Sequence, residues 1–429
     1  MYLATTGRRT DAPSRPAGTR RRVPGTVIAL GAVSLVTDVS SEMVTAVLPL
    51  YLVLGLGLSP LQFGFLDGLF NGATALVRLL GGRLADHGGG RHRTIAGAGY
   101  LLSALSRLGL LLAGGAAGGI AAALAADRLG KGVRTAPRDA LISLSAPPEA
   151  LGRAFGVHRA MDTTGALLGP VVAFAVLWAT ADAYDAVFAV SFATGLFGVL
   201  VLFLFVPAGA RAGAGAGAAG AGAGVAGAAA GSGPTGRSRN RSRALGDPVF
   251  RRVVTAAALL GAVTIGDSFL YLLLQRGLDL PPLLFPLLPL GAAAGYLLLA
   301  VPAGRIADRT GRRLPFLCGH VALLTAYLTL MAPPGWPAAV LVLVLLAVFY
   351  AATDGVLMAL AGPVLPPDGR AGGLAVLQTG QALARLVGAA GFGAAWTWWG
   401  PRPALAVAAL GLAAALVAAW RILPGRESS

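Results

Sequence analysis

Charged side chains recur inside long apolar stretches of this sequence, where a charge is costly and marks a candidate binding or proton site. Asp38 and Glu42 are four residues apart, so on a helix they share one face. Two neighbouring carboxyl groups resist double ionisation and a nearby cation favours it, so such a pair can bind and release a proton. We predict that Asp38 and Glu42 lie on a proton or substrate pathway.

A second group of charges lies in the fourth apolar stretch. Asp127, Lys131, Arg134 and Arg138 follow the spacing i, i+4, i+7, i+11, which places an acid and three bases on one stripe of a helix. Arg128 lies beside this stripe, and Lys131 is the only lysine of the sequence. Arg134 and Arg138 could be tolerated in the apolar stretch if their long side chains extended to the water at its end. Arg128 and Lys131 lie too deep in the stretch for this explanation. We expect the stripe to face acids of other stretches and to bind a polar solute, anionic or zwitterionic.

Acid and phenol groups are paired in two later stretches. Asp267 and Tyr271 are one helical turn apart, and so are Tyr350 and Asp354. Both pairs are candidates for the same proton or substrate pathway, because intramembrane acids mark such routes.

Three further residues are candidates for proton coupling, namely His158, Asp162 and Arg385. Imidazole titrates near neutral pH, so His158 with Asp162, at i, i+4, predicts a proton relay. The alternative is a structural ion pair between Arg159 and Asp162, at i, i+3, which would make the acid tolerable in an apolar span.

The composition is that of a membrane protein. Of the 429 residues 56% are hydrophobic and 12% are charged, with a mean hydropathy of +0.73. Soluble enzymes and nucleic-acid binders need more polar surface, and the single cysteine excludes an intrachain disulfide. The net charge of +16 comes mainly from arginines in segments that flank apolar stretches. We therefore expect a lipid bilayer, and no nucleic acid, as a partner.

Twelve apolar stretches are long enough to cross ~30 Å of hydrocarbon, which takes roughly 20 helical residues. They lie at about 26–50, 59–81, 94–114, 118–142, 153–177, 184–206, 251–275, 282–303, 314–332, 337–362, 370–397 and 402–421. Continuous apolar runs indicate helices rather than barrel strands. The sequence thus predicts an all-α membrane protein with twelve transmembrane helices in two pseudosymmetric six-helix halves.

The domain boundaries follow from these stretches. The halves cover 25–206 and 251–421. We expect disorder in the tail 1–24, in the Ala, Gly and Arg-rich linker 207–250 and in the tail 422–429, because such segments cannot bury enough apolar surface to become ordered.

Basic residues outside the spans fall almost entirely on one side of the predicted membrane. The opposite side holds only Arg276 and Arg402. The positive-inside rule then places both termini and the linker in the cytosol, at a plasma membrane. Abundant alanine and glycine, with arginine in place of lysine, indicate a GC-rich bacterial genome.

Two segments of the first half recur in the second. Gly-Arg-Leu-Ala-Asp at 82–86 recurs as Gly-Arg-Ile-Ala-Asp at 304–308, and residues 31–38 resemble residues 261–267. Each copy has the same place in its half, which indicates an internal duplication. Repeated halves around a midplane site are typical of secondary transporters.

The segment 304–313 matches a G-x-x-x-D-R-x-G-R-R pattern and resembles a loop of the major facilitator superfamily, and 82–93 is a weaker copy. The resemblance covers the chain except its tails and linker, and implies alternating access around a cavity lined by spans 1, 4, 7 and 10. It implies gating roles for Gly82, Asp86, Arg91, Asp139, Gly304, Asp308, Gly311 and Arg312.

The resemblance also implies where these gating groups lie. Asp86 is expected at the start of span 11 and Asp308 at the start of span 5, where a carboxylate meets unpaired helix N–H groups. A relay to Asp139, at the inner end of span 4, would use Arg91 or Arg93.

Gly165, Gly169 and Pro170 in span 5 resemble the antiporter motif of drug-proton exporters. Small residues four apart permit close helix packing. Pro170 removes a backbone hydrogen bond, so a kink is expected there.

Enzymatic function has little support in the sequence. Metalloprotease, P-loop and dinucleotide-binding motifs are missing, and a prenyltransferase would need two acidic clusters where only Asp182-x-x-Asp185 is found. The histidines are too scattered for a metal site, so neither a metal nor a cofactor is expected. We expect a monomeric secondary transporter, not an enzyme, that exports a small molecule with protons as coupling ion. Proton-coupled uptake and, more distantly, a non-transporting receptor or an intramembrane enzyme are the alternatives.

Overall fold

The structure is a computed structural model that describes residues 24–68, 92–146, 151–207, 247–353, 356–361 and 370–423. Every regular element in these ranges is a helix. Gly82, Asp86, Arg91 and Asp354 lie outside the described residues, as do nearly all of both tails and the linker. The expectations for them stay predictions.

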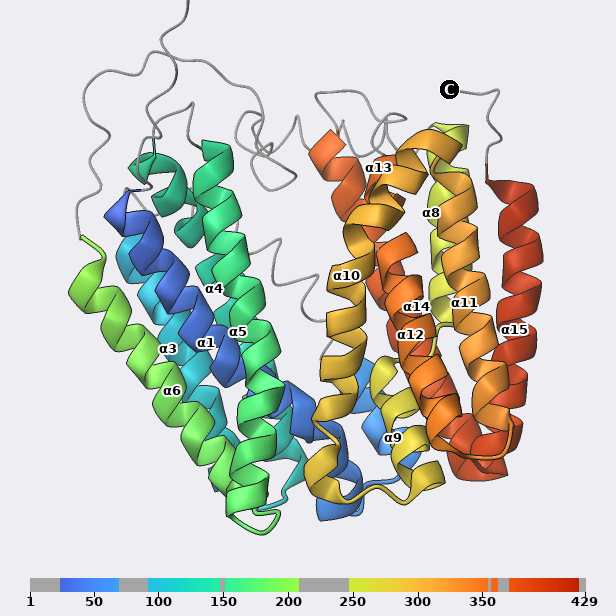
Figure 1. Ribbon diagram of the computed structural model, residues 1–429, viewed down its shortest axis with the longest axis horizontal. Coiled ribbons are helices and arrows are strands. Elements are labelled where there is room, and N and C mark those ends of the chain that lie inside the picture. The colour runs from blue at the N-terminus through green and yellow to red at the C-terminus, as the bar shows by residue number, and fades with distance from the viewer. Residues whose placement is uncertain are drawn as a thin grey trace, which may run out of the picture.

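The first half of the chain forms one helical bundle, on the left in Figure 1, except that its helix at 60–68 lies beside α9 of the second half. Its elements are α1 (Gly25–Leu50), the π-helical turn η1 (Tyr51–Gly55), a helix at 60–68, α3 (His92–Leu112), α4 (Ala117–Ser145), α5 (Leu151–Ala179) and α6 (Tyr184–Phe205). In this bundle α1 packs against α5 and α6, and α3 packs against α4.

The second half forms a bundle beside the first (Figure 1). Its elements are α8 (Pro248–Ala262), α9 (Asp267–Leu278), the short 3-10 helix η3 (Pro282–Leu284), α10 (Leu287–Thr310), α11 (Arg313–Met331), α12 (Trp336–Thr353), α13 (Val356–Ala361), α14 (Arg370–Trp399) and α15 (Pro401–Ile422). The helix limits agree with most of the predicted spans.

The predicted seventh span is not one continuous helix, contrary to expectation. α8 ends at Ala262 and α9 begins at Asp267. In the break, the N–H of Ile265 donates to the hydroxyl of Tyr327 on α11 at 2.7 Å, which satisfies a backbone group that the helix would otherwise bond. The break therefore places the Asp267 side chain at a helix N-terminus inside the bundle.

The predicted eighth span is longer than expected. α10 continues to Thr310, so most of the segment 304–313 is helical rather than a loop. Gly311 ends the helix with φ +88°, a conformation that glycine adopts without strain, and Arg312 precedes α11. Gly304 lies in α10, and the side chain of Asp308 is outside what the structure describes.

The two bundles repeat one contact at equivalent positions. At the start of α3, Arg93 donates to the carbonyl of Phe203 near the end of α6 and lies 5.2 Å from that ring's centroid. At the start of α11, Arg313 donates to the carbonyl of Trp420 near the end of α15, with 4.6 Å to its ring centroid. A cation is favourable at a helix C-terminus and over an aromatic face. The repetition supports the predicted duplication.

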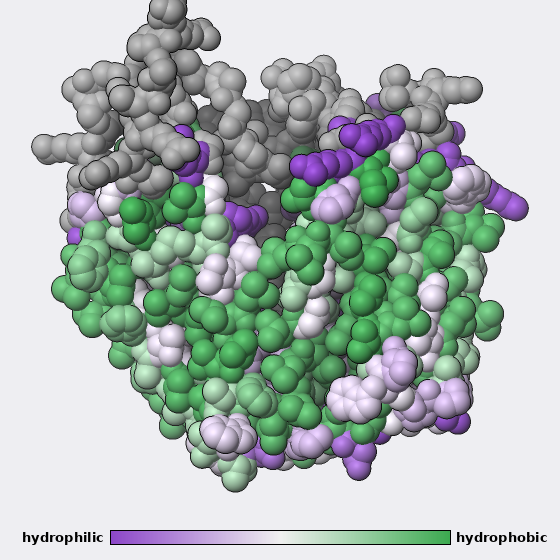
Figure 2. Space-filling model, in the orientation of Figure 1, coloured by the Kyte–Doolittle hydropathy of each residue, from purple (hydrophilic) through white to green (hydrophobic). Residues whose placement is uncertain are grey.

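The helices are long enough to cross a membrane, and the surface of both bundles is largely apolar. In the described residues, nine helical stretches are long and apolar enough to cross a membrane. α4 and α14, with 29 and 30 residues, also exceed the roughly 20 residues that a span needs. Figure 2 shows apolar side chains over most of the visible flank of both bundles. The chain is an all-α, multi-pass membrane protein; the count of twelve spans stays a prediction, because part of 59–81 is not described.

The bundles meet at one end and diverge at the other (Figure 1). At the closed end, 60–68 packs on α14 and α9, and α5 contacts η3 and α10. At the open end, where α6 stops and α8 begins, Figure 2 shows a recess between the bundles.

Glycines of α5 set how closely it approaches α1. A Cβ at Gly165 would collide with the backbone of Leu35, and a Cβ at Gly169 would lie 2.6 Å from the Cβ of Glu42. The predicted packing role of both glycines is therefore confirmed. α5 runs as one helix through Pro170, and the kink remains a prediction.

Gly165→Val should lower the thermal stability of the purified protein, because overpacking a close contact costs about 1–3 kcal/mol. The matched control is Gly156→Val on the same helix, where an added Cβ meets nothing within 4 Å. Thermal unfolding in detergent measures both. Equal melting temperatures for the two variants would contradict the tight contact between α1 and α5.

Candidate functional site

The acids of α1 pair with the bases of α4. The carboxylate of Asp38 lies 3.2 Å from the guanidinium of Arg134, and that of Glu42 lies 4.0 Å from the ammonium of Lys131. Residue numbers run in opposite directions in the two pairs, as expected for antiparallel helices one turn apart. The structure thus confirms that Asp38 and Glu42 share one face, and it turns that face toward the basic stripe.

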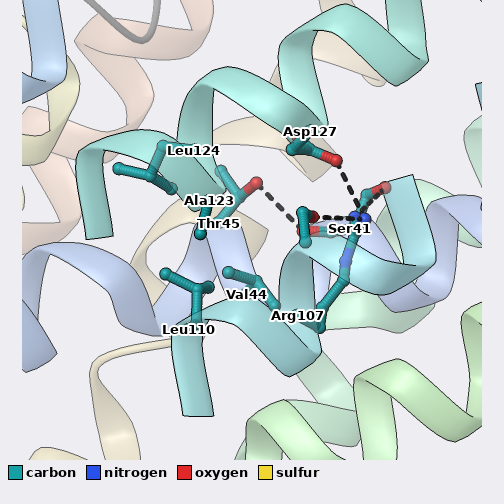
Figure 3. A pocket seen from close by; sticks show the side chains of 9 residues that line it. Ser41, Val44, Thr45, Arg107, Leu110, Ala123, Leu124 and Asp127 are labelled. Carbon is teal, nitrogen blue, oxygen red and sulfur yellow. Dashed lines mark hydrogen bonds and ion pairs between the residues drawn. The ribbon is translucent and has the colours of Figure 1, made fainter. Parts of the chain in front are cut away.

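Asp127 is enclosed by donors from α3 and α4. Its carboxylate accepts from the Ser103 hydroxyl at 2.6 Å and lies 2.9 Å from Arg107 and 3.3 Å from Arg128. Arg107 also donates to the Ser41 hydroxyl at 2.8 Å, so this group joins α1, α3 and α4 beside a small cavity (Figure 3). Arg107 and Asp127 are almost fully buried, so the short pair between them ties helices together.

Lys131 lies between two acids and is close to neither. Its ammonium is 3.8 Å from Asp127 and 4.0 Å from Glu42. Charge-assisted hydrogen bonds are typically about 2.7–2.9 Å long, and an ammonium has three donors. The side chains of Lys131 and Glu42 are 18% and 33% exposed. Lys131 is therefore accessible and retains donor capacity for a ligand.

The inner end of the stripe meets acids of α4 and α5. Arg138 lies 3.0 Å from Asp139 and 3.8 Å from Asp162, and the exposed Arg159 lies 3.5 Å from Asp162. The structural ion pair between Arg159 and Asp162 is thus present. Extension to water does not explain Arg134 or Arg138, because both pair with acids.

The expected relay of His158 with Asp162 is not formed, and the relay to Asp139 is not formed through Arg93; its alternative through Arg91 lies outside the described residues. The ring of His158 is hydrogen-bonded through Nε2 to the Ser34 hydroxyl on α1 at 2.9 Å, rather than to Asp162. Arg93 contacts the end of α6, and Asp139 is paired with Arg138. His158 and Arg93 each contact another helix instead of the expected acid, whereas Asp139 pairs with its neighbour Arg138 on α4.

The second bundle has its own acid and phenol cluster. The hydroxyl of Tyr350 on α12 lies 2.6 Å from each carboxylate oxygen of Asp267, at the start of α9. Arg385 of α14 interacts electrostatically with Asp267, as does the buried Tyr271. The structure therefore unites spans 7, 10 and 11 around Asp267. Asp267 was expected to face the bases of span 4; its described partners instead belong to the second bundle.

A contact between the bundles closes the end opposite the recess. The hydroxyl of Ser268 on α9 donates to the carboxylate of Asp67 at 3.0 Å, and the N–H of Leu61 donates to the hydroxyl of Thr397 at 3.0 Å. Asp67 also lies against Gly266, the residue before α9, where a Cβ would be 2.7 Å from its carboxylate. A carboxylate at a helix N-terminus is stabilising. From the sequence alone Asp67 is only a charge within the apolar stretch 59–81, and its partner follows from the break in span 7.

Asp67→Asn should favour separation of the bundles at this end. The amide loses the negative charge that interacts with the N-terminus of α9, and such a charge–helix interaction contributes up to ~2 kcal/mol when it is partly buried. The readout is disulfide cross-linking between Leu61→Cys and Thr397→Cys, in a chain that also carries Cys318→Ser. We expect a lower yield with Asp67→Asn than with Asp185→Asn, a substitution in the first turn of α6. The same yield in both would mean that Asp67 does not hold this end closed.

Two helical bundles around buried charge networks define a multi-pass membrane protein of the two-bundle transporter type. The chain matches the model of the Major Facilitator Superfamily over residues 30–295 and 268–429, and it therefore belongs to this family.

Two relatives by sequence are named as uncharacterized proteins. An uncharacterized MFS-type transporter of Methanocaldococcus jannaschii is 32% identical over 183 residues, which cover 43% of this chain and 45% of that protein. An uncharacterized protein of Mycobacterium tuberculosis is 35% identical over 158 residues, 37% of this chain and 38% of that protein. Each match spans less than half of the relative.

Solved structures share the fold at low identity. A bacterial homolog of the human lysosomal transporter Spinster, inward-facing and unoccupied, has a TM-score of 0.68 at 18% identity over 95% of each chain. A nucleoside transporter has a TM-score of 0.72 at 14% identity, over 93% of this chain and 98% of that one. A POT family transporter in complex with 5-aminolevulinic acid has a TM-score of 0.70 at 14% identity, over 93% and 96%.

Proposed function

We propose that this protein is a secondary transporter that exports a small polar solute with an anionic group across the plasma membrane, by alternating access and in exchange for protons. The observation that carries the proposal is the long ion pair between Lys131 and Glu42: the ammonium and the carboxylate are 4.0 Å apart and both side chains are partly exposed. A zwitterionic solute can replace this pair, its anion meeting Lys131 and its cation meeting Glu42. No buried charge is then left unpaired, which is the costly alternative.

Exchange with protons follows from repulsion between like charges on α1. A cationic group of the solute at Glu42 disfavours a proton on Asp38, one helical turn away, so solute and proton each disfavour binding of the other. The resemblance of Gly165, Gly169 and Pro170 to an antiporter motif favours the same direction. Gly169 lies directly against Glu42, which links that motif to the proposed exchange site. The 5-aminolevulinic acid named with the POT family transporter also combines an amine and a carboxyl group.

Uptake together with protons is the second candidate. A solute that carries an anionic group and no cationic group would add negative charge near Lys131. Lys131 in turn acts electrostatically on Asp38. Added negative charge favours the protonated form of a neighbouring acid, so solute and proton would bind together and move in one direction.

We also propose twelve spans in a monomer, with both termini and the linker in the cytosol. In Figure 1 α1 and α8 begin, and α6 and α15 end, at the same end of the bundles, which supports an even number of spans in each half. The recess between the bundles lies at this end (Figure 2). Under this topology the recess opens to the cytosol.

The test compares solute pools inside and outside bacterial cells that carry the wild-type chain, Lys131→Ala or no protein. Export predicts a solute that accumulates outside only with the wild-type chain, and uptake predicts the reverse. If no solute differs between wild type and Lys131→Ala, the proposal is wrong.

A further inference from the structure

Two acids from different spans meet in the first bundle. The Ser34 hydroxyl on α1 lies 2.9 Å from Nε2 of His158 on α5, and one helical turn further along the same two helices the carboxyl groups of Asp38 and Asp162 face each other. The approach is possible because glycines of α5 bring it against α1. A carboxylate only accepts hydrogen bonds, so a hydrogen bond between two carboxyl groups needs a proton on one of them.

Cations of α4 flank both ends of this pair. Arg134 lies 3.2 Å from Asp38, and Arg138 lies 3.8 Å from Asp162. Lys131 also acts on Asp38. These contacts offer each carboxylate a counter-charge when the shared proton leaves.

Other helices near the pair add few titratable groups. On α5 itself, His158 and the exposed Arg159 act on Asp162. From α3, the ring of Tyr100 lies 4.5 Å from the guanidinium of Arg134. α6 also packs on α1, and its one charged residue, Asp185, is in its first turn, at the end opposite the recess.

We propose that Asp38 and Asp162 share one proton and are the proton-binding site of the transport cycle. In the loaded state one carboxyl O–H donates to the other carboxylate. On release the O–H bond breaks, the proton passes to water, and Arg134 and Arg138 each pair with one carboxylate. Water has access because the two acid side chains are 18% and 19% exposed.

In this assignment solute and proton bind at two different positions on α1. The role of the proton in transport rests on the proposed function. Glu42 faces Lys131, where the solute binds, and Asp38 faces Asp162 one turn nearer the cytosolic end. The sequence alone suggests a pair of Asp38 with Glu42; the packing of α5 on α1 supplies a different partner.

Infrared spectroscopy of the purified full chain in lipid tests the pair without any solute. The C=O stretch of a protonated carboxyl group is distinct from that of a carboxylate and shifts in D₂O. We expect a band from a protonated carboxyl group near neutral pH that is lost in Asp38→Asn and in Asp162→Asn, because an amide donates to the remaining carboxylate without a proton. Asp185→Asn should retain the band.

Labelling aspartate with ¹³C in the wild-type chain keeps the test independent of variants, since it shifts an aspartic acid band and leaves a glutamic acid band in place. A band that does not shift, or that survives in both single variants, or no band at all, would overturn the shared proton even if the wild type transports. A band with the expected behaviour in a chain that moves no solute would instead contradict the proposed function.

Discussion

Replacing Lys131 with alanine should raise the solute concentration for half-maximal transport at least about tenfold. Hydrogen bonds to charged groups contribute about 1.5–3 kcal/mol, and each 1.4 kcal/mol is a factor of ten. The loss is expected to be large because Lys131 lies between Asp127 and Glu42, and its removal leaves those acids with less positive charge nearby. The measurement is the concentration dependence of transport into liposomes, with the solute that the comparison of cells identifies.

Two controls separate binding from folding. Lys131→Arg keeps the charge and should retain most of the affinity, and Arg402→Ala removes an exposed cation in the first turn of α15. An unchanged half-maximal concentration in Lys131→Ala would remove Lys131 from the binding site.

Asp38→Asn should abolish accumulation of solute driven by a pH gradient and leave exchange of solute for solute. An asparagine cannot take up and release the proton at this position, but solute exchange needs only the site at Lys131 and Glu42, one turn away. We expect gradient-driven accumulation to fall to the level of liposomes without protein, because the gradient no longer drives the solute. The matched control is Asp185→Asn, in the first turn of α6.

Undiminished accumulation in Asp38→Asn would exclude Asp38 from the proton path. Asp162, Asp267 and Asp354 would then remain as candidates.

Much of the fold could be predicted because spans are set by local hydropathy. The limits of α1 and α6 agree with 26–50 and 184–206, and the glycine spacing of α5 gives a real contact with α1. The break before α9 was missed because Val263, Thr264 and Ile265 are as apolar as the residues around them. The available signal was β-branched residues followed by glycine, which disfavours helix.

Contacts between residues of different helices were harder to predict than the helix face on which each residue lies. Helical spacing placed Asp38, Glu42 and the bases of α4 on common faces, and the structure brings those faces together. Spacing says nothing of which helix packs where, so Arg107 with Asp127 and Asp67 with Ser268 could not be predicted. Long-range packing also replaced the expected relay of His158 with a hydrogen bond to Ser34.

The most direct test of proton-coupled transport is the pH inside liposomes that contain the wild-type chain and an enclosed pH-sensitive dye. The identified solute is added outside with no imposed gradient, and Lys131→Ala liposomes are the control. Exchange predicts that the lumen becomes more alkaline as solute enters and protons leave, with a much smaller change in the variant. Entry of solute with no change in lumen pH would contradict proton coupling, and acidification would contradict exchange in favour of movement together with protons.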